Sequence, residues 1–240
     1  MSAVNVIIDK ELKVAFNSLA TYIIYTVFFC ITGFICWFSW KNVFYSGQAS
    51  LNYLFNVFYW TLFLMIPVLT MKSISDERKD GTFELLFTKP IKPWQFLCGK
   101  FFAILLQIIF CLVLTLPYYI TLTSLGHVDH AAGFCGYLGL ILVSGCYISM
   151  GIFASSLTSN TVVAFFLSFA IGIWFQFLFE FIAELFNSGF LAAFFTYLSM
   201  GEHFDAIPRG VIDTKDFVYF ISITTIFLAL ARYFISRTRA

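Results

Sequence analysis

The stretch from Ala131 to Phe179, AAGFCGYLGLILVSGCYISMGIFASSLTSNTVVAFFLSFAIGIWFQFLF, contains no Asp, Glu, Lys or Arg. A helix needs about 20 apolar residues to cross the hydrocarbon core of a bilayer, so this run is long enough for two crossings. The polar cluster SSLTSN, residues 155–160, is the place where the run can break. The stretch therefore predicts two membrane-spanning helices, at about 134–156 and 161–185.

The rest of the chain follows the same pattern. Charge-free runs also cover residues 14–40, 42–71 and 101–128, and 60% of all residues are hydrophobic, with 33 Phe. The mean hydropathy is +0.89. These features predict an all-α polytopic membrane protein with six transmembrane helices and exclude a soluble domain. The four further helices are expected at about 18–39, 53–72, 98–124 and 217–236.

Charge and cysteine usage exclude several classes of protein. The formal net charge is +1, whereas nucleic-acid binding requires a basic face. The six cysteines lie inside or at the edge of apolar runs and form no CxxC pair, which favours small apolar filling residues over zinc ligands or disulfides. The first 20 residues carry four charges and no apolar segment followed by a cleavage site, so a signal peptide is not expected.

The distribution of Lys and Arg predicts the orientation of the chain. With the N-terminus inside, eleven of these residues fall on the inner side and three, Lys41, Arg209 and Lys215, on the outer side. Cytoplasmic loops carry the excess of Lys and Arg, so both termini are expected in the cytoplasm. Residues 1–17 precede the membrane domain 18–240. They predict an amphipathic helix in the cytoplasmic interface, because apolar residues recur there at helical spacing: Val4, Ile8, Leu12, Ala15 and Phe16.

The cytoplasmic loop 73–100 concentrates the charge of the protein. Nine of its 27 charged residues lie within DERKDGTFELLFTKPIKPWQFLCGK, residues 76–100. Gly81 interrupts the charged run, and the segment 82–87 that follows predicts a short amphipathic helix. Such a helix at the membrane surface favours contact with a soluble partner; alternatively, the lysines of an ordinary inner loop only fix the topology. Pro90 and Pro93 are expected to end this helix and start the next one, and Lys100 to snorkel.

This loop resembles the signature loop of ABC-2 type transporter permeases, in which E-R/K-x-x-G-T-x-E-L-L is followed by T-x-P and by G-K at the next span. The matching residues are Glu77, Arg78, Gly81, Thr82, Glu84, Leu85, Leu86, Thr88, Pro90, Gly99 and Lys100. In that family the segment is the coupling helix that docks on the nucleotide-binding subunit. The resemblance implies contact with a separate ATPase for nine residues: Glu77, Arg78, Gly81, Thr82, Phe83, Glu84, Leu85, Leu86 and Pro90.

The resemblance also implies the wider assembly. Residues 1–17 would be the connecting helix of the family. The family works with two permease halves, so a second copy or a related permease subunit with a periplasmic domain is implied, in a bacterial inner membrane. The chain has no G-x-x-x-x-G-K-S/T motif, because Gly99-Lys100 is followed by Phe101. We therefore expect no cofactor and no enzymatic activity in this chain; ATP and Mg would bind the partner ATPase.

A second block narrows the resemblance. EHFDAIPRGVIDTKDFVYF, residues 202–220, is similar to the segment before the last span in the gliding-motility permeases of the Gld system. A similar block occurs in permeases of nitrous-oxide-reductase maturation, which is the nearest other branch. The first of these branches implies a role in gliding motility, and the second a role in copper or nitrous-oxide-reductase maturation.

Two acidic residues, Glu180 and Glu184, lie one helical turn apart near the outer end of the fifth predicted span. Ionisable groups at membrane depth are costly and usually face a bundle interior or water. They are candidates for the translocation path or an outer gate; alternatively, Glu184 lies at the interface, close to Asn187. No His or Ser accompanies them on that face, which argues against a catalytic dyad.

The outer segment 187–216 contains GFLAAFFTYL, residues 189–198, which is apolar but too short to span the membrane. It predicts a re-entrant or interfacial helix, and the resemblance implies that this helix helps close the outer gate. The candidate residues for the gate or for a periplasmic partner are His203, Phe204, Arg209, Gly210, Asp213 and Asp216. Alternatively, Arg209 pairs with Asp213 and caps the last span.

A short outer loop, HVDH, carries His127, Asp129 and His130. These residue types can ligate zinc or copper. Three of them within four residues of one loop also describe an ordinary solvated turn, so no metal site is predicted.

The preferred function is thus the membrane subunit of an ATP-driven exporter or force-transmitting complex, with lipid and an ATPase as partners. Two alternatives belong to other classes. A membrane enzyme would use Glu180 or the histidines and would act without nucleotide, but the chain shows no assembled nucleophile and base. A scaffold that anchors an ATPase or a motility complex would bind the ATPase and move no substrate.

Overall fold

Six helices in the described part of the chain are long and apolar enough to cross a membrane, as the sequence predicts. The computed structural model describes residues 3–38, 51–81, 92–126, 128–186, 189–207, 210 and 213–237. Every element in these ranges is a helix. The six spans are Leu19–Phe38 (α2), Leu51–Thr70 (α4) continued by Lys72–Lys79 (α5), Pro93–Leu114 (α7) continued by Leu116–Leu125 (α8), His130–Leu157 (α9), Thr161–Leu185, and Thr214–Arg237 (α14).

Helix α9 lies at the centre of the bundle and packs against α4, α7, α14 and the following helix. Its sequence explains this position, since glycines let neighbouring helices approach closely. A Cβ atom at Gly151 would lie 2.0 Å from Thr70 Oγ1, and one at Gly136 would lie 2.3 Å from the Phe55 ring. The α4–α9 contact therefore depends on the absence of side chains at these two positions.

The long uncharged run breaks at the predicted polar cluster. α9 ends at Leu157, and α10 (Thr161–Ile173) begins after Asn160, whose Oδ1 accepts a hydrogen bond from Val162 N at 2.9 Å. An Asn at this position satisfies backbone N–H groups that the first helical turn leaves unpaired. The polar cluster thus acts as the end of one span and the cap of the next.

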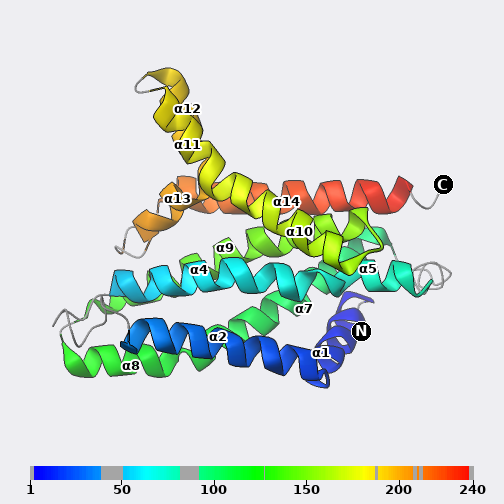
Figure 1. Ribbon diagram of the computed structural model, residues 1–240, viewed down its shortest axis with the longest axis horizontal. Helices are drawn as coiled ribbons and strands as arrows, with labels where there is room; N and C mark the ends of the chain where they lie inside the picture. Colours follow the sequence, from blue (N-terminus) through cyan, green and yellow to red (C-terminus); the bar gives the residue numbers. More distant parts are fainter. Residues whose placement is uncertain are drawn as a thin grey trace.

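One end of the bundle gathers the N-terminal helix α1 (Ala3–Phe16), helix α5 and the C-terminal end of α14 (Figure 1). Both ends of the chain therefore lie on the same side as the charged helix α5. Helix α1 packs against α7, where Ile7 is buried and a Cβ atom at Gly99 would lie 2.6 Å from Ile7 Cγ2. The sequence predicts a helix in this segment, and the structure has one at Ala3–Phe16. Its buried residue is Ile7, which the predicted apolar stripe does not include.

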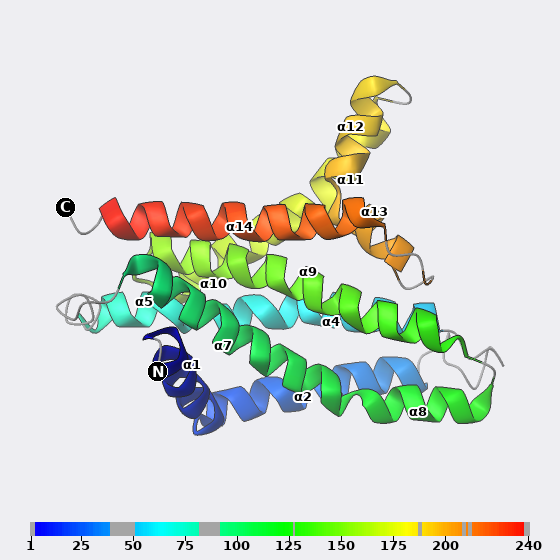
Figure 2. The same ribbon diagram turned by 180° about the vertical axis from the view of Figure 1, so that it is seen from behind.

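At the opposite end, the fifth span leaves the bundle. After α10 the chain forms a π-helix, Trp174–Leu178 (η1), and then α11 (Phe179–Leu185). Helices α11 and α12 (Phe190–Leu198) pack against each other as a hairpin that projects away from the bundle (Figure 2). Helix α13 (Met200–Ala206) then returns to the bundle. The apolar segment 189–198 forms a short helix, as its length predicts.

Candidate coupling and gating sites

A buried ion cluster joins α1, α5 and α7 at the end that carries the termini. Lys100 Nζ lies 3.0 Å from Glu77 Oε1 and 3.2 Å from Glu11 Oε1, and Lys10 Nζ lies 3.6 Å from the same Glu77 oxygen. The Lys100 side chain is only 2% exposed. A buried ammonium group is tolerated only when it is paired. The prediction that Lys100 snorkels towards water is therefore wrong, because two carboxylates inside the protein neutralise it.

This cluster brings together two residues of the signature loop, Glu77 and Lys100, which are 23 positions apart. Glu77 was predicted to contact an ATPase, and the structure turns it towards α7 and α1. Glu11 completes the cluster, although sequence reasoning did not select it. Its position one turn beyond Ile7, on the face of α1 that packs on α7, is the signal that could have identified it.

Two hydroxyl groups, one in the last turn of α9 and one at the start of α10, hydrogen-bond to α5. Ser155 Oγ accepts hydrogen bonds from Ile74 N and Ser75 N, both at 3.0 Å, and donates to Met71 O at 3.1 Å. Thr161 Oγ1 donates to Asp76 Oδ1 at 2.7 Å. Ser155 therefore supplies the N-terminal cap of α5 from another helix. Sequence reasoning used this polar cluster only as a helix break and missed its contact with α5.

The remaining candidate coupling residues lie in the last turn of α5 and after it. Arg78 lies in its last turn, and Gly81 has φ +69°, a backbone conformation that favours glycine. Gly81 thus ends the charged helix, as predicted. Pro93 stands in the first turn of α7, also as predicted. Six candidates lie outside the described residues: Thr82, Phe83, Glu84, Leu85, Leu86 and Pro90.

A second polar group lies inside the bundle, and the sequence analysis did not select its residues. Gln176 of the π-helix accepts hydrogen bonds at Oε1 from Tyr59 of α4 and, at 3.1 Å, from Tyr147 of α9. All three side chains are buried. π-helical turns often occur at functional sites, and here the turn directs an amide into the core. Phe204 of α13 stacks on Tyr59 with ring centroids 4.4 Å apart, so α13 contacts this network directly.

The candidate gate residues His203 and Asp216 form a buried pair at the end of the bundle opposite α1 and α5 (Figure 1). His203 Nδ1 lies 2.6 Å from Asp216 Oδ1, and His203 Nε2 lies 2.8 Å from Tyr197 O. Tyr219 stacks on the imidazole with ring centroids 4.0 Å apart. Each ring nitrogen of His203 therefore has an oxygen partner inside the protein. The pair fixes α13 and the end of α12 on α14.

The other outer candidates lie apart from this pair. Asp213 lies before α14, where its carboxylate accepts from Lys215 N at 3.2 Å and lies 3.1 Å from Lys215 Nζ. The amide and the ammonium group of Lys215 lower the pKa of the Asp213 carboxyl group. Gly210 has φ +85°. Arg209 is outside the described residues, so its predicted pairing with Asp213 stays a prediction.

Glu180 and Glu184 both line a cavity of about 260 Å³ between α11, α12 and α13. The two residues lie one turn apart on α11, as their spacing predicts, and their role at an outer gate stays a prediction. Glu202 from α13 faces the same cavity, and sequence reasoning did not select it.

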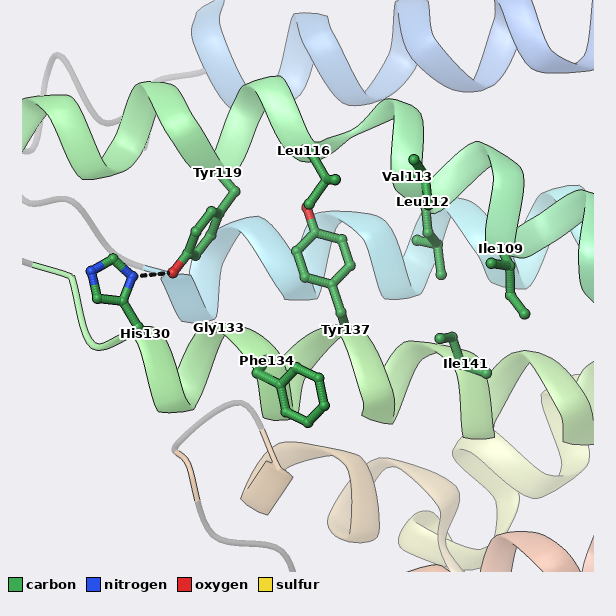
Figure 3. Close-up of a pocket in the computed structure, with 10 residues that line it drawn as sticks. All are labelled: Ile109, Leu112, Val113, Leu116, Tyr119, His130, Gly133, Phe134, Tyr137 and Ile141. Carbon is green, nitrogen blue, oxygen red and sulfur yellow. Dashed lines mark hydrogen bonds between the residues drawn. The ribbon is translucent and has the colours of Figure 1, made fainter.

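The HVDH loop is engaged in local contacts. Asp129 Oδ1 caps α9 by accepting from Ala131 N at 2.9 Å, and His130 Nδ1 lies 2.7 Å from Tyr119 Oη. His127 is outside the described residues, among which no group of three metal-ligating side chains occurs. Tyr119 and His130 point towards each other at one end of an apolar pocket of about 340 Å³ between α7, α8 and α9, as Figure 3 shows.

Six apolar spans, a buried ion cluster at one end and short helices at the other define an all-helical, multi-pass membrane protein. A family model described as ABC-2 family transporter protein matches residues 5–238 of the chain. The chain therefore belongs to the ABC-2 transporter family, whose members are the transmembrane components of transporters that generally work with an ABC ATPase. Among curated proteins, none matches this chain.

Proposed function

We propose that this chain is the permease subunit of an ATP-driven exporter or force-transmitting complex, and that a separate ATPase docks on the loop after α5. The observation that carries the proposal is the attachment of α5 to four other helices. Ser155 and Thr161 bind it from α9 and α10, and Glu77 joins it to α7 and α1 through Lys100. A force applied at residues 77–90 would thus reach most of the bundle.

A path from α5 to the outer end supports this mechanism. The α4–α9 contact at Gly151 and Thr70 lies next to α5, and the same two helices carry Tyr59 and Tyr147 further along. These tyrosines contact Gln176, and Tyr59 contacts Phe204 of α13. Closely packed helices move as units, so a displacement of α5 would change the packing of α13. The residues His203, Phe204 and Asp216 would then act at the outer gate.

The finer assignment rests on the resemblance of residues 202–220 to the gliding-motility branch; the nitrous-oxide-reductase maturation branch is the nearest alternative. The distribution of Lys and Arg supports an orientation with both termini in the cytoplasm, and the resemblance implies a bacterial inner membrane. α2 and the fifth span are the least buried spans, with 28% and 22% of their apolar windows buried. This exposure supports a second permease copy or a related subunit beside them, and ATP and Mg would bind the ATPase.

Co-purification from native membranes tests the proposal. The tagged chain should co-elute with a P-loop ATPase in near-stoichiometric amount. Glu84→Arg should remove the ATPase because it reverses a charge in the proposed docking segment, and Phe83→Ala with Leu86→Ala should weaken it. Lys13→Glu, on the exposed side of α1, is the control and should retain it. Absence of an ATPase in crosslinked membranes would overturn the proposal; an ATPase bound without any transported molecule or force would favour a scaffold.

A further inference from the structure

The cavity between α11, α12 and α13 is acidic and lies outside the path described above. Its lining consists of Glu180, Ala183 and Glu184 from α11, Thr196 from α12, and Ser199 and Glu202 around the start of α13. Within the described part of the chain, none of its three carboxylates takes part in an ion pair, and Lys215, in the first turn of α14, is paired with Asp213. The cavity therefore carries uncompensated negative charge.

One hydroxyl group in this lining is buried without a partner. Ser199 is 1% exposed, and its Oγ atom makes no hydrogen bond with any of the described residues. A buried hydroxyl that is left unpaired costs about 1–3 kcal/mol, so such groups normally have a partner. Because Ser199 lines the cavity, a molecule bound there can supply it.

The polar groups of the cavity are mainly acceptors. Ionised carboxylates only accept hydrogen bonds, and Thr196 Oγ1 already donates to Ala192 O at 2.9 Å. A complementary ligand therefore carries positive charge and several donor hydrogens. An ammonium group has both, with three N–H donors and no acceptor. A compact metal ion fits less well, since the described residues contain no group of three side chains close enough to ligate one.

A neighbouring apolar cavity extends the site. It has a volume of about 390 Å³, shares Glu180 and Glu184 with the acidic cavity, and is otherwise lined by Ile173, Phe177, Leu178 and Phe181. A ligand with its cationic group at the two shared carboxylates can therefore place an apolar chain along η1 and α11. We propose that the two cavities together bind an organic amine, with the ammonium group among Glu180, Glu184 and Glu202 and the alkyl part against Phe177 and Phe181.

Two sources can supply this chemistry: a free alkylamine and the aminoethyl headgroup of a membrane lipid. The experiment measures binding of hexylamine by calorimetry to the purified chain in phosphatidylcholine nanodiscs, and again in nanodiscs that contain phosphatidylethanolamine. Saturable hexylamine binding in both membranes supports a free amine. Binding that is lost when phosphatidylethanolamine is present supports the lipid headgroup as the occupant. Hexanol, which has the same chain without the charge, should not bind at the site.

Variants assign the binding to the cavity. Glu180→Gln, Glu184→Gln and Glu202→Gln combined should weaken hexylamine binding at least tenfold, about 1.4 kcal/mol or more. Ser199→Ala should weaken it about threefold, since one hydrogen bond is lost. Asp205→Asn, an exposed carboxylate on α13 outside the lining, is the matched control and should leave the affinity within about twofold. Glu202→Gln alone provides a milder variant if the triple variant does not fold.

Three results would overturn the inference. These are the absence of saturable hexylamine binding in phosphatidylcholine, equal binding by the triple variant and the wild type, and calcium binding at the three carboxylates without any amine binding. The measurement uses the isolated chain without nucleotide, so its failure would leave the proposed coupling to an ATPase unaffected.

Discussion

Lys100 Nζ lies 3.0 Å from Glu77 Oε1, and this contact ties the start of the third span to the helix that continues the second. Both residues belong to the segment that resembles the signature loop of the family, and their ion pair joins the beginning of that segment to its end. Glu11 of α1 shares the same ammonium group at 3.2 Å. The N-terminal helix is thus joined to the same ion cluster, so a displacement of α5 would act on α1 and α7 together.

Removing the shared cation should destabilise the protein. Lys100→Met leaves Glu77 and Glu11 with only the exposed Lys10 as a shared cation, and breaking a buried pair in this way costs about 3 kcal/mol. Unfolding in detergent, followed by circular dichroism, measures the change. Lys13→Met is the control, because Lys13 pairs with Asp9 in an exposed position, where an ion pair contributes less than about 1 kcal/mol. Equal effects of the two substitutions would contradict the buried-cluster interpretation.

The close approach of α4 and α9 predicts a steric effect. Gly151→Ala places a Cβ atom 2.0 Å from Thr70 Oγ1, and overpacking of this kind costs about 1–3 kcal/mol. Gly145→Ala on the same helix is the control, since its nearest neighbours would lie at 3.7 Å. Thermal unfolding should separate the two variants, and adding Thr70→Ser, which removes only a methyl group, should not rescue Gly151→Ala. Equal midpoints for the two alanine variants would show that α4 and α9 pack less closely.

The interior network predicts coupling between α4 and the π-helix. Gln176→Leu removes the acceptor of both Tyr59 and Tyr147 and leaves their buried hydroxyl groups with only the long 3.5 Å contact between them, at a cost of about 1–3 kcal/mol. In a double-mutant cycle, Tyr59→Phe should cost much less in the Gln176→Leu background than in the wild type. Tyr22→Phe, on the exposed face of α2, is the control. Additive effects of Tyr59→Phe and Gln176→Leu would be inconsistent with the hydrogen bond.

Two aspartates that are three residues apart, Asp213 and Asp216, lie in different surroundings near the start of α14. Asp216 is buried against His203, whereas Asp213 is exposed and pairs with Lys215. Asp216→Asn removes the carboxylate oxygen that lies 2.6 Å from the buried His203 Nδ1, so we expect a loss of about 1–3 kcal/mol. Asp213→Asn should change the stability by less than about 1 kcal/mol. Unfolding curves of the two variants measure their losses of stability. A loss for Asp213→Asn as large as that for Asp216→Asn would contradict the prediction.

The sequence predicts the helical architecture well because the signal is local. Charge-free runs longer than a bilayer, a polar break at 155–160 and a glycine after a charged helix all act within one segment. Contacts between segments are different. The sequence gives no measure of which acid reaches Lys100, which helix receives Ser155, or where a π-helical turn directs Gln176. Those outcomes depend on how six helices pack together, and so the coupling contacts and the acidic cavity appear only in three dimensions.

The central claim is that α5 passes the movement of an ATPase to the outer helices. The most direct measurement is hydrogen–deuterium exchange of the purified complex in nanodiscs, with and without a non-hydrolysable ATP analogue and Mg. We predict altered exchange in both α5 and α13 of the wild type. In the variant Ser155→Ala with Thr161→Val, the change should stay in α5, because its attachment to α9 and α10 is lost. Unchanged exchange in α13 of the wild type, or an equal response of α13 in the variant, would contradict the account.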